Sequence, residues 1–210
     1  MLKLLRPAVT RILTPLGRAL ARRGISPNVV TAFGTFGTVA AALFFYPRGE
    51  LFPGTVVITI FVLADLLDGV MARMGGEGSL WGAFLDSTLD RVGDAGIFSG
   101  LVIWFMVSGQ RTLAAVALFC LVAGALVSYV KARAEGLGLN CDVGLAERPE
   151  RLVVGLVSAG LGGLGVPYVL AAGLWLLAVA SVVTVVQRLL HVRRQAASAA
   201  AGTLRSPGER

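Results

Sequence analysis

Long uncharged apolar runs alternate along this chain with short clusters of basic residues. No charged residue occurs at 24–47, at 112–130 or at 152–187. A helix that crosses the hydrocarbon core of a bilayer needs about 20 mostly apolar residues, and each run is close to that length or longer. Composition agrees, since only 15% of the 210 residues are charged, against about a quarter in ordinary soluble domains. The pattern predicts an all-α integral membrane protein.

Breaks between the runs predict six transmembrane helices. They are expected at 28–46, 51–73, 80–108, 112–135, 148–161 and 166–190. The last uncharged run is too long for one span, and "GGLGVP" at 162–167 divides it, because glycine and proline disfavour a continuing helix. We expect the six helices to form one domain over residues 25–192.

The two ends of the chain have different patterns. In residues 1–24, apolar side chains recur at three- and four-residue steps with arginines between them, which predicts an amphipathic helix lying in the membrane interface. The alternative is a plain basic anchor that orients the protein. Residues 193–210 are small and polar, and we expect them to form a disordered tail.

Basic residues gather on one side of the expected membrane topology. Six lie in the first 24 residues, and more flank the second and fourth connections, whereas the other side has only Arg48 and Arg111. Lys and Arg accumulate in cytoplasmic segments. We therefore expect a multi-pass protein of the plasma membrane with both termini in the cytoplasm. The net charge of +7 would then face anionic membrane lipids rather than a nucleic acid.

One apolar region carries an unusual number of acidic residues. Asp65 and Asp68 are three residues apart and share a helix face, as do Asp86 and Asp90, four apart. The "MGGEGS" turn at 74–79 allows the two helices to pack antiparallel, which brings four carboxylates together. An intramembrane charge costs about 2.5–3.5 kcal/mol at a helix centre. Divalent cations compensate such a cluster, and Mg²⁺ or Mn²⁺ prefers carboxylate oxygens.

The spacing of these residues also resembles a known motif. The segment reads Asp65-x-x-Asp68-Gly69-x-x-Ala72-Arg73, then eight residues, then Gly82-x-x-x-Asp86-x-x-x-Asp90. This resembles the signature of the CDP-alcohol phosphatidyltransferase family. The resemblance implies a six-helix membrane enzyme that transfers a phosphatidyl group from CDP-diacylglycerol to an alcohol and releases CMP. It also implies that Asp65, Asp68 and Asp86 hold two Mg²⁺ ions, and that Asp90 binds the second metal and acts as general base.

The same resemblance suggests the residues that bind the CDP-diacylglycerol donor. Gly69 has no side chain and lets a ligand approach the backbone, and Arg73 can contact phosphate oxygens with two N–H groups. "SPNVVT" matches another element of the family, at a helix N-terminus that attracts anions. The expected donor-binding residues are Asn28, Val29, Val30, Thr31, Gly69, Arg73 and Ser79.

Cations at three helix ends point to the acceptor. Lys131, Arg151 and Arg188 lie on the expected catalytic side and predict a pocket for an acceptor that carries its own phosphate, with Arg133 and Arg148 flanking it. Ordinary positive-inside bias is the alternative. These segments resemble the actinobacterial members of the family, which implies inositol 1-phosphate as acceptor. Two other functions stay open: the same chemistry with glycerol 3-phosphate, as in a phosphatidylglycerophosphate synthase, and a cation transporter.

Several further residues lie outside the motif. Asp94 continues the four-residue series past Asp90, and we expect it to pair with Arg91 or with a neighbouring helix; a role in the site is the alternative. Gly93, Gly96 and Gly100 predict a helix contact, either within one chain or between two copies in a homodimer. Cys120, Cys141 and His191 show no ligand pattern and are expected to be structural.

Overall fold

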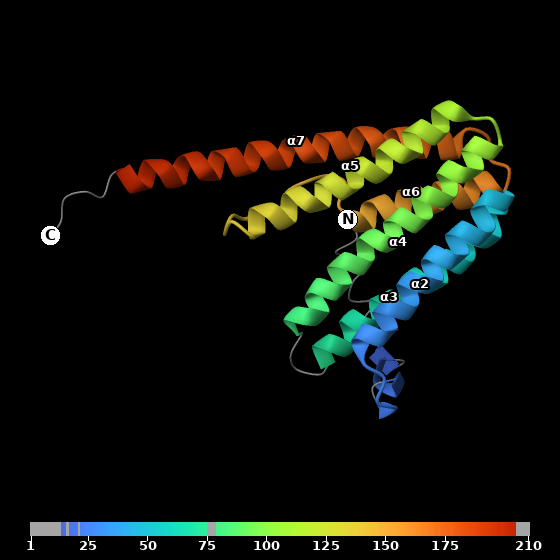
Figure 1. The fold of residues 1–210 in the computed structure, drawn as a ribbon, viewed down its shortest axis with the longest axis horizontal. Coiled ribbons are helices and arrows are strands. Elements are labelled where there is room, and N and C mark those ends of the chain that lie inside the picture. The colour runs from blue at the N-terminus through green and yellow to red at the C-terminus, as the bar shows by residue number, and fades with distance from the viewer. Residues whose placement is uncertain (1–13, 16, 21, 75–78, 205–210) are drawn as a thin grey trace.

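The computed structural model describes residues 14–15, 17–20, 22–74 and 79–204, and it has no strand among them (Figure 1). Its elements are α2 (Pro27–Phe45), the short 3₁₀ helix η2 (Tyr46–Arg48), α3 (Leu51–Met74), α4 (Leu80–Val107), α5 (Arg111–Glu135), α6 (Arg148–Gly163) and α7 (Val169–Leu204). The all-α prediction is confirmed.

Five of the six long helices begin and end within two residues of the expected positions. Local chemistry explains two of these starts. The Ser26 side chain accepts a hydrogen bond from the Val29 N–H and caps α2, and the Ser79 side chain accepts one from the Gly82 N–H, at 2.9 Å, and caps α4. Gly49 and Gly109 follow helical segments with φ values of 79° and 73°, which glycine adopts without strain.

The sixth helix is the exception. It was expected to end at residue 190, but α7 continues to Leu204, so the expected disordered tail at 193–210 is wrong for residues 193–204. The sequence there, "RRQAASAAAGTL", is rich in alanine, the residue with the highest helix propensity. Residues 205–210 lie outside the described part of the chain. So does most of the amphipathic segment expected at 1–24, which stays a prediction.

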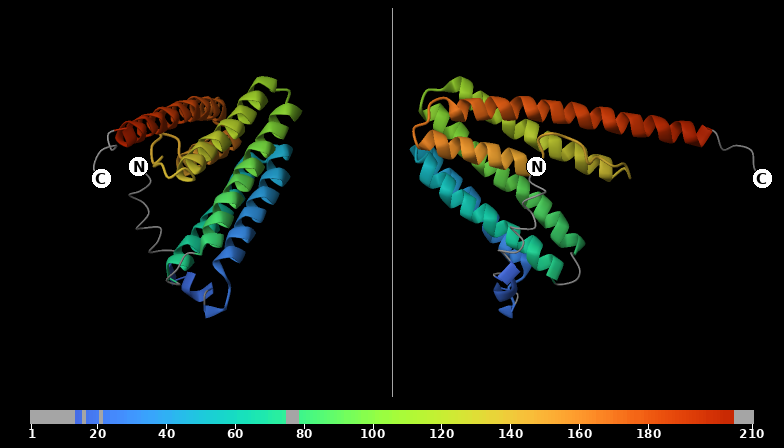
Figure 2. Two further views of the ribbon diagram at one scale, coloured as in Figure 1. Left: turned by 60° about the vertical axis from the view of Figure 1, so that its left-hand side comes forward. Right: turned by 180° about the vertical axis from the view of Figure 1, so that it is seen from behind.

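The six helices form a ring. Among the described residues, the main packing pairs follow the order α2, α3, α6, α7, α5, α4 and back to α2, so that α4 and α6 stand opposite each other. Figures 1 and 2 show that successive helices along the chain run in opposite directions, and that the helices lie close together where α2, α4 and α6 end and diverge toward the other end. The acidic motif and the basic clusters lie toward the diverging end.

Small residues let α2 and α4 approach closely. A β-carbon at Gly96 would lie 2.8–2.9 Å from Val39, including its backbone, and one at Gly100 would lie 2.6 Å from the Ala42 carbonyl oxygen. Real β-carbons do not tolerate such distances, so both positions require glycine. The helix contact predicted for these glycines is confirmed within one chain.

Apolar side chains on the outside of the ring indicate a membrane environment. In the described part of the chain, three segments are long and apolar enough to cross a bilayer: Pro27–Arg48, Arg111–Glu135 and Val169–Ser198. A shorter apolar stretch covers Leu51–Ala64. Many large apolar side chains are exposed, including Phe33, Phe36 and Trp175, as expected for surfaces in contact with lipid. The protein is therefore a membrane protein.

Candidate active site

The two halves of the acidic motif lie at the same end of the ring. Asp65, Asp68, Gly69 and Arg73 belong to the last three turns of α3, and their side chains lie outside the described part of the chain. The second half occupies the first turns of α4. Helix α2 packs against both α3 and α4, whereas α3 and α4 have little direct contact with each other in the described part of the chain, so the antiparallel packing expected for these two helices is not found there.

The two carboxylates of α4 have different surroundings. Asp86 is exposed and forms no ion pair with another described residue. The Asp90 side chain is only 15% exposed. One of its oxygens lies 2.6 Å from Arg148 Nη1, and the other lies 3.6 Å from Arg91 Nη1. Asp90, the expected base, is thus held from α6, across the ring.

The donor set suits a hard divalent cation. Among the described side chains, no three His, Cys, Asp or Glu groups gather closely enough to hold a metal, but Asp65 and Asp68 fall outside those side chains. All four expected ligands are carboxylates, which Mg²⁺ and Mn²⁺ prefer. Exposed Asp86 retains ligand positions for an ion. The residues fit a metal site of this kind.

Part of the expected donor site is brought together at the helix starts. A β-carbon at Gly82 would lie 3.2 Å from Asn28 Oδ1 and 3.0 Å from Ser79 Oγ, so these three residues of α2 and α4 are neighbours. The Ser79 side chain is already engaged as the cap of α4. A ligand that formed a hydrogen bond with the Ser79 hydroxyl would do so alongside the bond that this hydroxyl already accepts from the Gly82 N–H.

In the rest of the first turn of α2, the polar groups form hydrogen bonds with one another. The N–H groups of Val29 and Val30 are bonded to Ser26, and Thr31 Oγ1 donates to the Pro27 carbonyl at 3.1 Å. Val30 and Thr31 are buried, whereas Val29 is 60% exposed. Of the four expected donor residues here, Val29 faces away from the core and Asn28 faces α4.

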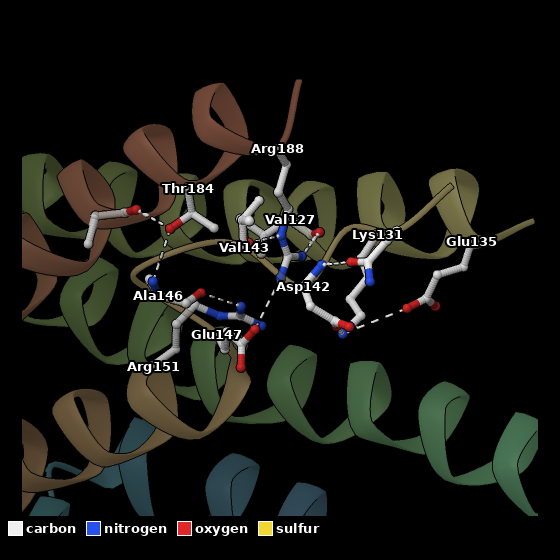
Figure 3. A network of polar contacts seen from close by, with 12 residues as sticks. Val127, Lys131, Glu135, Asp142, Val143, Ala146, Glu147, Arg151, Thr184 and Arg188 are labelled. Atoms are coloured by element: carbon white, nitrogen blue, oxygen red, sulfur yellow. Dashed lines mark hydrogen bonds and ion pairs between the residues drawn. The ribbon is translucent and has the colours of Figure 1, made fainter. Parts of the chain in front are cut away.

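The three expected acceptor cations gather around the connection at 136–147, which links α5 to α6 (Figure 3). Arg188 of α7 is 2% exposed. Its Nε donates to the Val143 carbonyl at 2.8 Å and its Nη1 donates to the Val127 carbonyl at 2.5 Å. Its Nη2 lies 3.6 Å from a carboxylate oxygen of Glu147. This arginine ties α7 to both α5 and the connection.

Arg151 of α6 is equally enclosed. It is 3% exposed, and it donates from Nη1 to the Ala146 carbonyl at 3.2 Å and from Nη2 to Asp94 Oδ2 at 3.1 Å. Ala146 is fixed from the other side as well, because its N–H donates to Thr184 Oγ1 at 3.0 Å. A β-carbon at Gly124 would lie 3.1 Å from Arg151 Nε, so α5 passes close to the guanidinium.

Lys131 is the most accessible of the three cations. Its side chain is 33% exposed, and Nζ lies 2.5 Å from Asp142 Oδ1 and 3.7 Å from Glu135. Arg133, which was expected to flank the pocket, is exposed on α5. The structure therefore brings Lys131, Arg151 and Arg188 into one region, and each forms an ion pair with a carboxylate of the chain.

Two residues are more deeply involved than their sequence positions suggested. Asp94 pairs with Arg148 and Arg151 of α6, which confirms the neighbouring-helix alternative, whereas Arg91 pairs with Asp90. Arg148, expected only to flank the acceptor pocket, contacts both aspartates of α4. In the sequence, the four-residue spacing of Asp86, Asp90 and Asp94 was the one indication that Asp94 lies on the same helix face as the motif.

Comparison with known proteins identifies the family. The family model described as CDP-alcohol phosphatidyltransferase matches residues 24–186. The chain belongs to this family. It is 53% identical to a phosphatidylinositol phosphate synthase of Streptomyces avermitilis over 209 residues, which cover 96% of this chain and 86% of that protein. It is 49% identical to the protein of that name in Mycobacterium tuberculosis, over 88% of this chain and 87% of that protein.

Solved structures of the M. tuberculosis phosphatidylinositol phosphate synthase have the same fold. One, with CDP-DAG bound, superposes with a TM-score of 0.82 at 49% identity and covers 87% of this chain and 94% of that chain. Another, in complex with manganese and citrate, has a TM-score of 0.82 at 48% identity and covers 86% of this chain and 88% of that chain. The family member described here is thus a metal-dependent transferase of phospholipid biosynthesis.

Proposed function

We propose that this protein transfers the phosphatidyl group of CDP-diacylglycerol to inositol 1-phosphate, giving phosphatidylinositol phosphate and CMP. The observation that carries the choice of acceptor is the meeting of Lys131, Arg151 and Arg188, from three helices, around one connection. An acceptor with its own phosphate can compete with the carboxylates of the chain for these cations, whereas an uncharged alcohol cannot. The relatives named phosphatidylinositol phosphate synthase support the same acceptor.

The family's acidic motif and the position of Asp90 support the following reaction. Asp90 takes the proton of the acceptor hydroxyl, and that oxygen attacks the phosphorus that carries diacylglycerol. The bond from this phosphorus to the bridging oxygen breaks, and CMP leaves with that oxygen. Two Mg²⁺ ions, held by Asp65, Asp68, Asp86 and Asp90, would neutralise charge on the diphosphate and on the leaving group. Mn²⁺ can take the same carboxylate ligands.

The donor and acceptor would approach from different sides of this centre. We assign the CDP-diacylglycerol to the starts of α2 and α4 and the end of α3, where Asn28, Ser79, Gly69 and Arg73 lie. The acceptor phosphate would bind near the 136–147 connection. Its arrival must displace or share the ion pairs that now occupy Lys131 and Arg188.

We also propose that all six long helices cross the plasma membrane with the site facing the cytoplasm. The basic-residue asymmetry supports this orientation. The α3 and α4 helices carry the charges of the motif, and α6 has only 16 residues, which explains why hydropathy alone does not select them. Single cysteines at positions 111 and 198, labelled in intact cells, test the topology. Labelling at 111 and protection at 198 are expected, and the reverse would contradict it.

Purified protein incubated with CDP-diacylglycerol, Mg²⁺ and separate acceptors tests the reaction. We expect CMP release with inositol 1-phosphate and none with free inositol. Efficient turnover of glycerol 3-phosphate without turnover of inositol 1-phosphate would replace this proposal with the phosphatidylglycerophosphate synthase reaction. Equal use of free inositol would show that no pocket for the acceptor phosphate exists.

A further inference from the structure

Asp94 has a position that the acidic motif does not explain. It lies on α4 one turn beyond Asp90, and its side chain is 13% exposed. Oδ1 lies 3.3 Å from Arg148 Nε and Oδ2 lies 3.1 Å from Arg151 Nη2, so both oxygens are used. Since α4 and α6 stand opposite each other in the ring, these ion pairs cross its interior.

The contacts of Asp94 belong to a continuous chain of charges. Arg148 also contacts Asp90, at 2.6 Å, and Arg151 also donates to the Ala146 carbonyl. The chain therefore runs from the expected base, through Arg148, Asp94 and Arg151, to the connection beside the acceptor cations. Two carboxylates and two guanidiniums balance in charge, which a partly buried cluster requires.

Asp94 is the one member of this chain of charges that contacts both arginines, and it is not itself assigned to a metal or a substrate. Arg148 and Arg151 are three residues apart on α6 and lie on one face of the helix. Without a carboxylate between them, two like charges would face each other in the ring interior. Long arginine side chains also lose rotamer freedom when a ligand orders them, and a partner that orders them beforehand reduces that cost.

We propose that Asp94 is a positioning residue for the transfer reaction. It holds Arg148 against the Asp90 carboxylate and Arg151 at the acceptor side, and thereby fixes the distance between the base and the acceptor phosphate. This inference rests on the proposed function, since it assigns Arg151 to the acceptor. Asp94 acts through the two arginines and does not itself touch a substrate.

The test separates acceptor binding from donor binding and from folding. Asp94→Asn keeps the size of the side chain but removes the charge and turns an amide N–H₂ toward one guanidinium. We expect the acceptor KM to rise about tenfold, the size of one lost charge-assisted contact, while the KM for CDP-diacylglycerol stays within about twofold. Asp94→Glu restores the charge and should recover much of the acceptor affinity. Glu50→Gln removes a carboxylate at the opposite end of the ring and should change neither constant.

Each result decides the inference. A selective rise in acceptor KM with recovery in Asp94→Glu supports it. An acceptor KM within about twofold of the wild type overturns it, and so does an equal change in both KM values accompanied by a lower Tm, which would indicate a role in folding alone. If Asp94→Asn does not fold, the same split is read from Asp94→Glu, whose displaced carboxylate should recover much but not all of the acceptor affinity, so that the acceptor KM alone still rises, by less than about tenfold.

The wild-type enzyme keeps this test apart from the proposed function. If it uses glycerol 3-phosphate instead of inositol 1-phosphate, the proposed function fails. The KM split is then measured with glycerol 3-phosphate, and it still decides the role of Asp94.

Discussion

The carboxylates of the α3–α4 motif and the cations around the 136–147 connection lie toward the same end of the helix ring, but their charges are balanced differently. Asp86 is exposed and forms no ion pair within the described part of the chain. Arg151 and Arg188 are at most 3% exposed, and each has a carboxylate and at least one carbonyl oxygen of the chain as partners.

This difference follows from burial. A buried charge is tolerated only with a partner, whereas a carboxylate at the surface can remain ionised in water. On the motif side, Asp86 can therefore receive its compensating charge from outside, as a metal ion, whereas Asp90 of the same motif already has Arg148 and Arg91 as partners. On the basic side, Lys131, Arg151 and Arg188 already have carboxylate partners, and a phosphate that binds there must compete with Asp142 or Glu147. With the proposed function, ligand binding would add charge at Asp86 and would exchange ion-pair partners at Lys131 and Arg188.

Removing the expected base, Asp90, should have the largest effect on activity and would test the α3–α4 motif without changing the cations around the 136–147 connection. Asp90→Asn is expected to lower kcat about 10²–10⁴-fold, the usual contribution of general-base catalysis, because the amide cannot take the hydroxyl proton. Binding of CDP-diacylglycerol should be largely retained, since the base acts on the acceptor. CMP release and equilibrium binding of the donor measure the two effects.

A matched variant separates the base from the metal ligands. Asp86→Asn should also lose CMP release, and higher Mg²⁺ concentration should restore part of it, which it cannot do for Asp90→Asn. Substantial turnover by Asp90→Asn would remove this residue from the role of base.

Truncating a buried arginine should have the next largest effect and would test the basic side. Arg151→Ala is expected to raise the acceptor KM about ten- to hundredfold, because charge-assisted contacts contribute about 1.5–3 kcal/mol each. The donor KM should change much less. Steady-state kinetics with each substrate varied in turn measures the difference. Arg193→Ala, an exposed arginine of α7, is the control and should leave both constants near wild type.

Glycine packing offers a smaller effect, confined to stability on the motif side. Gly96→Ala places a β-carbon within 2.9 Å of the Val39 backbone, so α2 and α4 must separate, at a cost of about 1–3 kcal/mol. Gly155→Ala meets only the Leu177 side chain, at 3.8 Å, and should be neutral or stabilising, because alanine favours the helix. Tm values in one detergent compare the two. A Gly96→Ala protein as stable as the wild type would contradict the close packing.

The exposed ion pair on the basic side should matter least. The Lys131 and Asp142 side chains are 33% and 66% exposed, and such pairs contribute about 1 kcal/mol or less. Asp142→Asn should lower Tm only slightly, and the difference should shrink in 1 M salt, where the screening length is about 3 Å. A large loss of stability that persists in high salt would show that this pair contributes as much as the ion pairs of buried Arg151 and Arg188.

Sequence patterns predicted the helices well and their arrangement poorly. Helix starts depend on neighbouring residues, and the structure shows such local signals in the caps Ser26 and Ser79. The order of helices around the ring depends on which faces meet, and a single sequence does not encode that locally. The "AASAAA" segment misled us for a related reason, since its small side chains are typical of disordered tails and equally of helices.

The site divides in the same way. The acidic motif has fixed spacing within two helices that follow each other in sequence, so its residues could be proposed as one site from the sequence alone. The partners of Asp94 come from a helix 54 and 57 residues further along the chain. Nothing in the spacing of Arg148 and Arg151 distinguishes a half-buried arginine from a fully buried one. Burial and pairing arise only when the ring closes.

The length of α7 affects where the protein can be shortened. Its 36 residues extend over about 54 Å at 1.5 Å per residue, far beyond the roughly 30 Å of hydrocarbon in a bilayer. In the extra turns, Gln195 exchanges two hydrogen bonds with the backbone of Asn140, at 2.6 Å and 3.1 Å. The last turns of α7, whose composition suggests that they are dispensable, thus hold in place the 136–147 connection, which surrounds Arg188. A protein truncated at residue 192 would lose the two hydrogen bonds from Gln195 to Asn140, whereas a tag fused after Leu204 would preserve them.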